Sequence, residues 1–272
     1  MRRSELVLED ARVIILRLGP WLRALVRRGD YRRLDENELR RTRRSETVFV
    51  FGSGWSLNEI TPEQWQEIEL HDTLGFNWFV HERFVRCDYQ LIRGIPDDDR
   101  DEGVWRPQLD EYFGLIKANP MFADTIFLVH SGFRAINGNR AIGNRYLPPG
   151  SRLFGWKSNK LSPWPTTSFA QGLAHGESTL QEAINFAYLL GWRRIVLAGV
   201  DLYDRRYFWL SPEQTRSVDV RRGASVTDEH ARATSGMIES LGTWRDWLAQ
   251  RDVALFVLNP RSSLAAVLPV FE

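Results

Sequence analysis

The chain has 272 residues, of which 43% are hydrophobic and 26% charged, and its formal net charge is +1. These values are typical of a globular α/β protein with one large core or two small ones. The balanced charge argues against nucleic acid as a partner. The single cysteine, Cys87, excludes an internal disulfide and a cysteine cluster for zinc.

The first 44 residues carry a local excess of positive charge, with 13 arginines against 7 acidic residues. An apolar run over residues 13–26 includes Trp21, but it is too short and too charged to span a bilayer. We therefore expect a basic helical extension over residues 1–46, docked on the core or on a partner subunit. Peripheral contact of residues 1–44 with an anionic membrane surface is the alternative.

Two closely spaced glycines follow a strand-like run. Val48–Phe51 are four strand formers, and Gly52 and Gly54 come directly after them. Such glycines allow a sharp turn and a close approach to a ligand, and the free N–H groups of the turn favour an anion. Ser56 and Glu59 have the spacing of a capping box. The layout is typical of a nucleotide or phosphate site, although a complete dinucleotide or P-loop motif is missing.

Strand-like and helix-like segments alternate from residue 47 onward, which predicts an α/β fold with a mainly parallel, Rossmann-like sheet and helices on both faces. The expected strands are Val48–Phe51, Thr73–Phe76, Tyr89–Ile92, Thr125–Val129, Arg194–Ala198 and Val253–Leu258. The expected helices are one opening at Thr61 and Pro62, then Gln108–Ala118, Ser178–Leu190 closed by Gly191, Glu229–Gln250 and Ser262–Leu268. Residues 131–170 and 203–228 look irregular, and such insertions are usually functional loops or lids. We expect one domain over 47–268 with a small lid at about 203–228.

Ligands of open α/β sheets bind at the carboxyl ends of the strands. The polar residues after the predicted strands are therefore the site candidates: Ser53 with Gly54, Asn77, Arg93, His130, Asp201 with Tyr203, and Asn259 with Arg261. Their side chains can hydrogen-bond a base, a ribose and a phosphate, but they include no pair of carboxylates.

Four blocks carry a resemblance to a known family. They are Gly52-Ser-Gly-Trp-Ser-Leu-Asn-Glu-Ile60, Gly75-Phe-Asn-Trp-Phe79, the stretch Gly176–Tyr203 with its Glu-Ser-Thr opening and Gly-Val-Asp-Leu-Tyr end, and Leu258-Asn-Pro-Arg-Ser-Ser-Leu264. In order and spacing they resemble bacterial sialyltransferases of glycosyltransferase family forty-two over residues 47–268. Those enzymes carry a Gly-Asn-Gly-Pro-Ser-Leu loop, a Cys-Asn turn, a helix opening with Thr-Ser, and a Gly-Ile-Asp-Phe-Tyr strand end.

The resemblance implies a GT-A-like variant of the fold, a CMP-activated sialic acid as donor, inverting transfer to a cell-surface glycan or glycolipid, and no metal or other cofactor. It implies His230 as the general base, with Tyr203 and Tyr207 on the donor phosphate. The implied donor-binding residues are Gly52, Ser53, Gly54, Ser56, Asn77, Ser178, Thr179 and Asp201. It also implies a cytoplasmic enzyme, at the inner face of the cell membrane if the extension binds lipid. A homo-oligomer is a further alternative.

Several departures keep other functions open. Ser53 replaces a family Asn, and Gly176 replaces an Arg, so another CMP-activated sugar acid or another nucleotide sugar is an alternative donor. Asp97 and Asp99 could hold a divalent metal on a nucleotide diphosphate, although a solvated turn is favoured. A pyrophosphokinase-like enzyme using ATP with magnesium and a non-catalytic nucleotide- or glycan-binding module are the two rival functions. The site residues also have structural alternatives: a left-handed turn at Asn77, a helix cap at Ser178, and lid packing at the two tyrosines.

Overall fold

The computed structural model describes residues 17–93, 102–133, 135–176, 178–203, 206–211, 213–214 and 228–272. It gives the backbone but not the side chains at residues 102, 104 and 228–235. Two of the predicted residues, Asp97 and Asp99, and most of the predicted lid lie outside the described residues.

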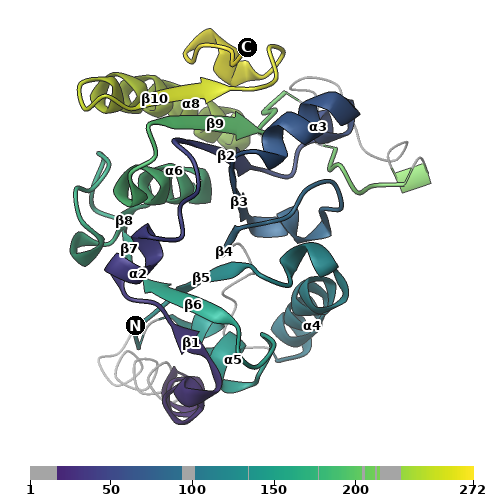
Figure 1. Ribbon diagram of the computed structural model, residues 1–272, viewed down its shortest axis with the longest axis vertical. Coiled ribbons are helices and arrows are strands. Elements are labelled where there is room, and N and C mark those ends of the chain that lie inside the picture. The colour runs from purple at the N-terminus through teal and green to yellow at the C-terminus, as the bar shows by residue number, and fades with distance from the viewer. Residues whose placement is uncertain are drawn as a thin grey trace.

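The described chain forms an α/β fold around an eight-stranded sheet whose neighbouring strands are all parallel, in the order β1-β6-β5-β4-β3-β2-β9-β10 (Figure 1). The strands are β1 (Arg32–Arg33), β2 (Thr47–Phe51), β3 (Asp72–Phe76), β4 (Tyr89–Ile92), β5 (Ile126–His130), β6 (Arg152–Trp156), β9 (Arg194–Ala198) and β10 (Ala254–Val257). A separate pair of short strands comprises β7 (Ser158–Asn159) and β8 (Leu173–Ala174). A parallel, Rossmann-like sheet is therefore confirmed.

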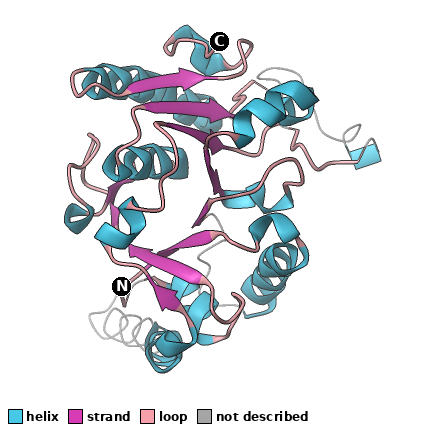
Figure 2. Ribbon diagram, viewed as in Figure 1, coloured by secondary structure: helices cyan, strands magenta, loops and turns pink. Residues whose placement is uncertain are grey.

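Helices cover both faces of this sheet (Figure 2). A first helix spans residues 17–26. The α-helices that follow are α2 (Glu36–Arg40), α3 (Pro62–Glu69), α4 (Glu102–Ala118), α5 (Ile136–Gly143), α6 (Thr179–Leu190) and α8 (Asp228–Ala249). The 3-10 helices are η1 (Arg27–Asp30), η2 (Trp55–Glu59), η3 (Asn77–His81), η4 (Pro120–Phe122), η5 (Phe169–Gln171) and η6 (Ser263–Ala266). None of the helices in the described ranges has both the length and the apolar character needed to cross a bilayer.

The side chains of each central strand alternate between two hydrophobic cores. Val48 and Val50 of β2 belong to the core that contains α6 and α8, whereas Phe49 and Phe51 belong to the core that contains α3 and α4. Parallel strands are buried on both faces, and this explains why they read as continuous apolar runs rather than as alternating patterns.

Two predictions about the chain's organisation need correction. Residues 131–170, expected to be irregular, contain α5 and the sheet strand β6. The predicted extension, residues 1–46, contributes the edge strand β1 to the sheet and the fully buried Leu39 to the core. Neither strand is visible in the sequence, because β1 has two residues and β6 lies among glycines and prolines. Both segments form strands because they pair with a neighbouring strand of the sheet, β1 with β6 and β6 with β5.

Candidate functional site

The order of strands reverses between β2 and β9. Strands β3 to β6 follow on one side of β2, whereas β9 and β10 lie on its other side. Such a switch point leaves a crevice at the carboxyl ends of the strands, where ligands of open α/β sheets bind. The loops after β2, β9 and β10 meet there (Figure 1), and a cleft beside them is lined by Ser56, Glu59, Gln64, Asn259 and Arg261, among others.

The two glycines after β2 are required by the loop after β9. A Cβ atom at Gly52 would lie 2.5 Å from the carbonyl oxygen of Gly199, and one at Gly54 would lie 2.5 Å from Oδ2 of Asp201. The N–H groups of Gly52 and Gly54 donate to the carbonyl oxygens of Ala198 and Gly199, each at 2.8 Å. These two N–H groups are therefore occupied inside the protein, contrary to the expectation that they are free for an anion.

Asp201 connects the three loops of the switch point. Its carboxylate is 3% exposed and accepts hydrogen bonds from the N–H of Ser56 at 2.9 Å, the Oγ of Ser56 at 2.5 Å and the Nδ2 of Asn259 at 3.1 Å. Its main-chain oxygen accepts from the N–H of Ser263 at 3.1 Å. Both carboxylate oxygens are thus used by protein donors, so the structure gives this predicted donor-binding residue a scaffolding role.

The expected capping box at Ser56 and Glu59 is wrong. These residues lie in the 3-10 helix η2, which has Gly54 as its N-cap and no side-chain cap. The capping box lies one element later, where the side chain of Thr61 accepts from the N–H of Gln64 and the side chain of Gln64 accepts from the N–H of Thr61. Ser56 is drawn away from capping because its hydroxyl donates to buried Asp201.

Tyr203 lies beside Asp201 and Asn259 at the switch point. Its hydroxyl oxygen accepts a hydrogen bond from Nδ2 of Asn259 at 3.2 Å. Burial, as the largest cause, raises the pKa of Tyr203 above its ordinary value, so the hydroxyl keeps its proton at neutral pH. Because the oxygen already accepts, its proton is available for an anionic acceptor such as a phosphate oxygen.

Tyr207 belongs to an aromatic stack next to the glycine turn. It forms a β-bridge with Gly54 and is 46% exposed. Its ring stacks on Trp209 with centroids 4.6 Å apart, and Trp209 stacks on His81 at 4.2 Å. Burial lowers the pKa of His81 to about 4, so its ring is neutral in the stack. Phe208, between Tyr207 and Trp209, is buried, and its N–H donates to the carbonyl oxygen of Ser53 at 3.3 Å. These contacts hold the two stacked rings beside the glycine turn.

Sequence reasoning missed Trp209 and His81, because stacking between distant segments leaves no local pattern.

Asn77 was expected either to contact a nucleotide or to form a left-handed turn. Its φ is +50°, so the left-handed turn is real. Its Oδ1 is also buried and has no hydrogen-bond partner in the part of the chain that the structure describes, which leaves one acceptor for a ligand donor.

The N-terminus of α6 holds two further predicted residues. Ser178 is the N-cap residue and Thr179 the first residue of the helix, but Ser178 makes no side-chain cap and instead donates to the Sδ of Met237 at 3.3 Å. Ser178 therefore does not cap the positive end of this 12-residue helix, and that end favours an anion. Gly176, just before it, has φ +52°, a conformation that the Arg of the resembling family would adopt only with strain.

A buried carboxylate lies one turn into α6. Glu182 is fully buried, and its Oε1 lies 2.5 Å from Nη1 of Arg93, 2.7 Å from Oγ of Ser158 and 3.2 Å from Nδ1 of His175. The histidine contact is within ion-pair distance but lacks hydrogen-bond alignment. Within the described ranges, Oε2 of Glu182 has no hydrogen-bond partner, and neither has Nε1 of Trp156. The Arg93 guanidinium lies over the ring of Trp156, 5.7 Å from its centroid.

Arg93 was a sequence candidate, but Glu182 was not. It sits between apolar neighbours on the inner face of α6, and a charged residue on that face was the signal that could have revealed it. The structure thus brings the predicted residues into two groups. Gly52, Ser53, Gly54, Ser56, Asp201, Tyr203 and Tyr207 surround the switch point, whereas Ser178 and Thr179 lie at the start of α6, the helix that carries Glu182.

The predicted base, His230, lies in the first turn of α8, but its side chain is outside the described part of the structure. Among the described side chains, no group of three His, Cys, Asp or Glu residues is placed to hold a metal ion. Asp97 and Asp99 fall outside that statement.

Comparisons with protein families, with curated proteins and with solved structures return no match for this chain. Its function is therefore inferred from the geometry of the site.

Proposed function

We propose that this chain is an inverting glycosyltransferase that takes a sialic acid or a related sugar acid from a CMP-activated donor. The acceptor is a hydroxyl group of a cell-surface glycan or glycolipid. One observation carries this proposal: three features lie together at the switch point. They are the stack of Tyr207 on Trp209, the protonated hydroxyl of Tyr203, and a glycine turn held by hydrogen bonds to the loop after β9.

The aromatic stack supports binding of a nucleotide. The ring of Tyr207 is half-exposed and rests on Trp209, so it offers a rigid surface for a base or a sugar ring. The free Oδ1 of Asn77 accepts a hydrogen bond from a base amino group or a ribose hydroxyl. A stack whose second face is already covered loses little entropy when a base is added.

The donor phosphate has two groups that favour it. The Tyr203 hydroxyl donates a hydrogen bond, and the N-terminus of α6 at Ser178 supplies its positive dipole. The guanidinium of Arg93 contacts Glu182 in the first turn of α6. It could supply the positive charge that the resembling family obtains from an Arg at the position of Gly176. Groups of this kind stabilise the negative charge that grows on the leaving phosphate, which is the work that a metal does in other transferases.

The proposed step is a direct displacement. The acceptor oxygen forms a bond to the anomeric carbon while the bond from that carbon to the phosphate oxygen breaks. CMP leaves with the electron pair, and the acceptor proton passes to His230, which lies at the start of α8 after the segment assigned to the lid. Attack from the face opposite CMP inverts the anomeric centre.

A nucleotide panel tests the proposal. Ligands that bind the folded state raise the melting temperature by mass action. We expect CMP and CTP to stabilise the protein, whereas ATP with magnesium should not. Stabilisation by ATP with magnesium alone would favour a pyrophosphokinase-like enzyme, and stabilisation by no nucleotide would favour a non-catalytic module. Leu70→Ala is a control variant, because Leu70 is exposed just before β3, at the amino end of that strand, whereas the proposed site lies at the carboxyl ends.

A further inference from the structure

The helix over residues 17–26 exposes an apolar stripe. Leu18, Leu22 and Val26 are 40%, 47% and 80% exposed. Their spacing of four residues places them on one face of the helix. Ala24, on the opposite side, is buried at 4%. This helix is therefore apolar both towards the core and away from it, and its outer face has no cover among the described residues.

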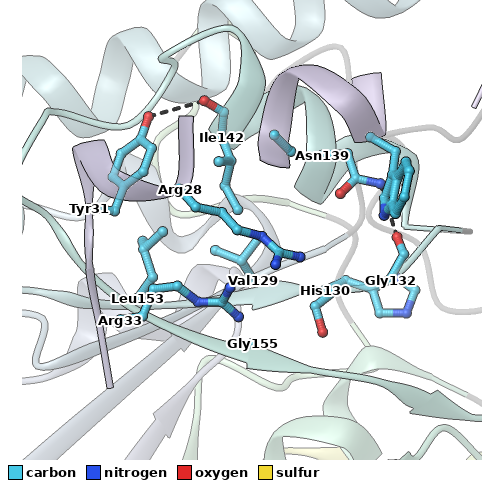
Figure 3. A pocket seen from close by; sticks show the side chains of 13 residues that line it. Arg28, Tyr31, Arg33, Val129, His130, Gly132, Asn139, Ile142, Leu153 and Gly155 are labelled. Carbon is cyan, nitrogen blue, oxygen red and sulfur yellow. Dashed lines mark hydrogen bonds between the residues drawn. The ribbon is translucent and has the colours of Figure 1, made fainter. Parts of the chain in front are cut away.

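The inner face of the helix is fixed to the domain. Trp21 and Ala24 line a pocket whose floor is formed by Val129 and Leu153 of β5 and β6 (Figure 3). Trp21 also packs edge-on against Phe133 with ring centroids 6.0 Å apart. Phe133 is itself 36% exposed. The stripe is thus presented by a docked helix.

Positive charge surrounds this apolar surface. Residues 17–29 contain four arginines and no acidic residue. Two guanidinium groups, those of Arg28 and Arg33, reach into the pocket behind the helix (Figure 3), and neither has an ion-pair partner in the described part of the chain. Arg23 is also exposed. An apolar stripe flanked by arginines is the surface that anionic lipid headgroups and the acyl boundary attract together.

We propose that this face docks the protein peripherally on an anionic lipid surface. The helix lies in the plane of the interface, Leu18, Leu22 and Val26 enter the headgroup boundary, and the arginines contact lipid phosphates. Figure 1 shows the helix at the β1 end of the sheet, away from the loops after β2 and β9, so docking leaves the switch point open. The inference does not depend on the proposed transferase activity.

Charge decides between lipid and a second copy of the chain. In a two-fold dimer the same patch meets itself. The arginines of residues 17–29 in one copy would then face the same arginines in the other, which costs free energy, whereas an anionic membrane neutralises them. Leu70 and Leu161 are also exposed, but each stands alone on other elements, as scattered surface apolar residues usually do.

Vesicle flotation with the full chain tests the proposal. We expect binding to vesicles that contain phosphatidylglycerol, little binding to pure phosphatidylcholine, and loss of binding at high salt. Leu22→Asp and Val26→Asp should each lower the partition coefficient about tenfold, because they place a charge in the apolar stripe. Leu70→Asp and Leu161→Asp, at leucines that are 66% and 94% exposed on other elements, should leave the partition coefficient unchanged.

The arginines are tested separately. Arg23→Gln and Arg27→Gln should each weaken binding to phosphatidylglycerol vesicles about fivefold. Arg193→Gln, at an exposed arginine before β9, is the control. The wild-type comparison of the two lipids needs no variant, so it stands even if a variant folds poorly. Absence of binding to phosphatidylglycerol, or equal binding to both lipids, would overturn the proposal. So would a lipid-free dimer, seen by light scattering, that Leu22→Asp dissociates.

Discussion

Asp201 and Glu182 are both buried carboxylates, but their hydrogen-bond partners are arranged differently. Asp201 receives three hydrogen bonds, and both of its oxygens are used. In Glu182 one oxygen contacts Arg93, Ser158 and His175, and the other has no hydrogen-bond partner among the described side chains. A fully satisfied carboxylate holds loops together, whereas a half-satisfied one keeps an acceptor for something that is not part of the protein.

This difference separates scaffold from chemistry. Sequence patterns single out Gly52, Gly54 and Asp201 most readily. The polar groups of these residues form hydrogen bonds within the protein that hold the loops of the switch point together. Asn77 and Glu182, by contrast, each keep a buried acceptor oxygen without a hydrogen-bond partner among the described residues. We therefore expect substitutions in the first set to act mainly on stability and substitutions in the second set mainly on ligand binding.

The largest expected effect concerns the base and not either carboxylate. His230→Ala should lower the rate of transfer about 10²–10⁴-fold while CMP affinity stays nearly unchanged, since a general base acts on the acceptor proton only. Steady-state turnover together with CMP titration measures both quantities. His175→Ala is the matched comparison. If it loses more activity than His230→Ala, the base lies in the Glu182 group and the proposed role of His230 is wrong.

A third buried carboxylate sharpens the comparison through pH. Glu82 is 1% exposed and accepts from the N–H groups of Phe84 and Val85, and its Oε1 has no hydrogen-bond partner among the described residues. Burial raises the pKa of Glu82 from 4.5 to about 7. Between these values only the folded state keeps the proton, so the free energy of unfolding should fall as pH rises, by up to about 3 kcal/mol.

The variant that tests this is Glu82→Gln, which stays neutral at every pH. Urea titrations from pH 4 to 8 should show a smaller decline with rising pH for Glu82→Gln than for the wild type. Comparing the two curves cancels the contribution of His81, whose lowered pKa of about 4 makes stability rise with pH in the same window. Parallel curves would show that Glu82 titrates normally.

A pair of isosteric substitutions tests the comparison itself. Asp201→Asn introduces an amide donor among three donors, so we expect a loss of about 2 kcal/mol in the free energy of unfolding. Glu182→Gln can turn its amide towards the unpartnered position, so its loss should stay below about 1 kcal/mol while CMP stabilisation weakens. Urea denaturation and the nucleotide shift measure the two effects. The comparison fails if Glu182→Gln is the more destabilising of the two.

A smaller effect is expected from the aromatic stack. Tyr207→Ala removes the half-exposed ring and should weaken CMP binding about fivefold, since a base–aromatic contact contributes about 1 kcal/mol or more. Tyr207→Phe keeps the ring and should retain the affinity, although loss of the hydroxyl can slow transfer. Isothermal titration with CMP measures the affinity, and an unchanged affinity in Tyr207→Ala would remove the base from this stack.

The smallest expected effect is that of chelation. With phosphate charge stabilised by Tyr203 and the N-terminus of α6, activity should be the same with and without EDTA. Loss of activity that manganese or magnesium restores would assign the chemistry to Asp97 and Asp99.

The sequence by itself determined six strands of the sheet, β2 to β5 together with β9 and β10. Continuous apolar runs such as Arg194–Ala198, the Thr61 cap and Gly191 at the end of α6 predicted strands and helix ends that the structure confirms, because these signals are local. The tertiary structure alone decided β1 and β6, whose pairing across the sheet has no local signature. It also decided what each polar residue does. Asp201 connects three loops, whereas Glu182 keeps one acceptor oxygen unused by the described residues. Their hydrogen-bond partners come from segments far apart in the chain, and only folding brings these segments into contact.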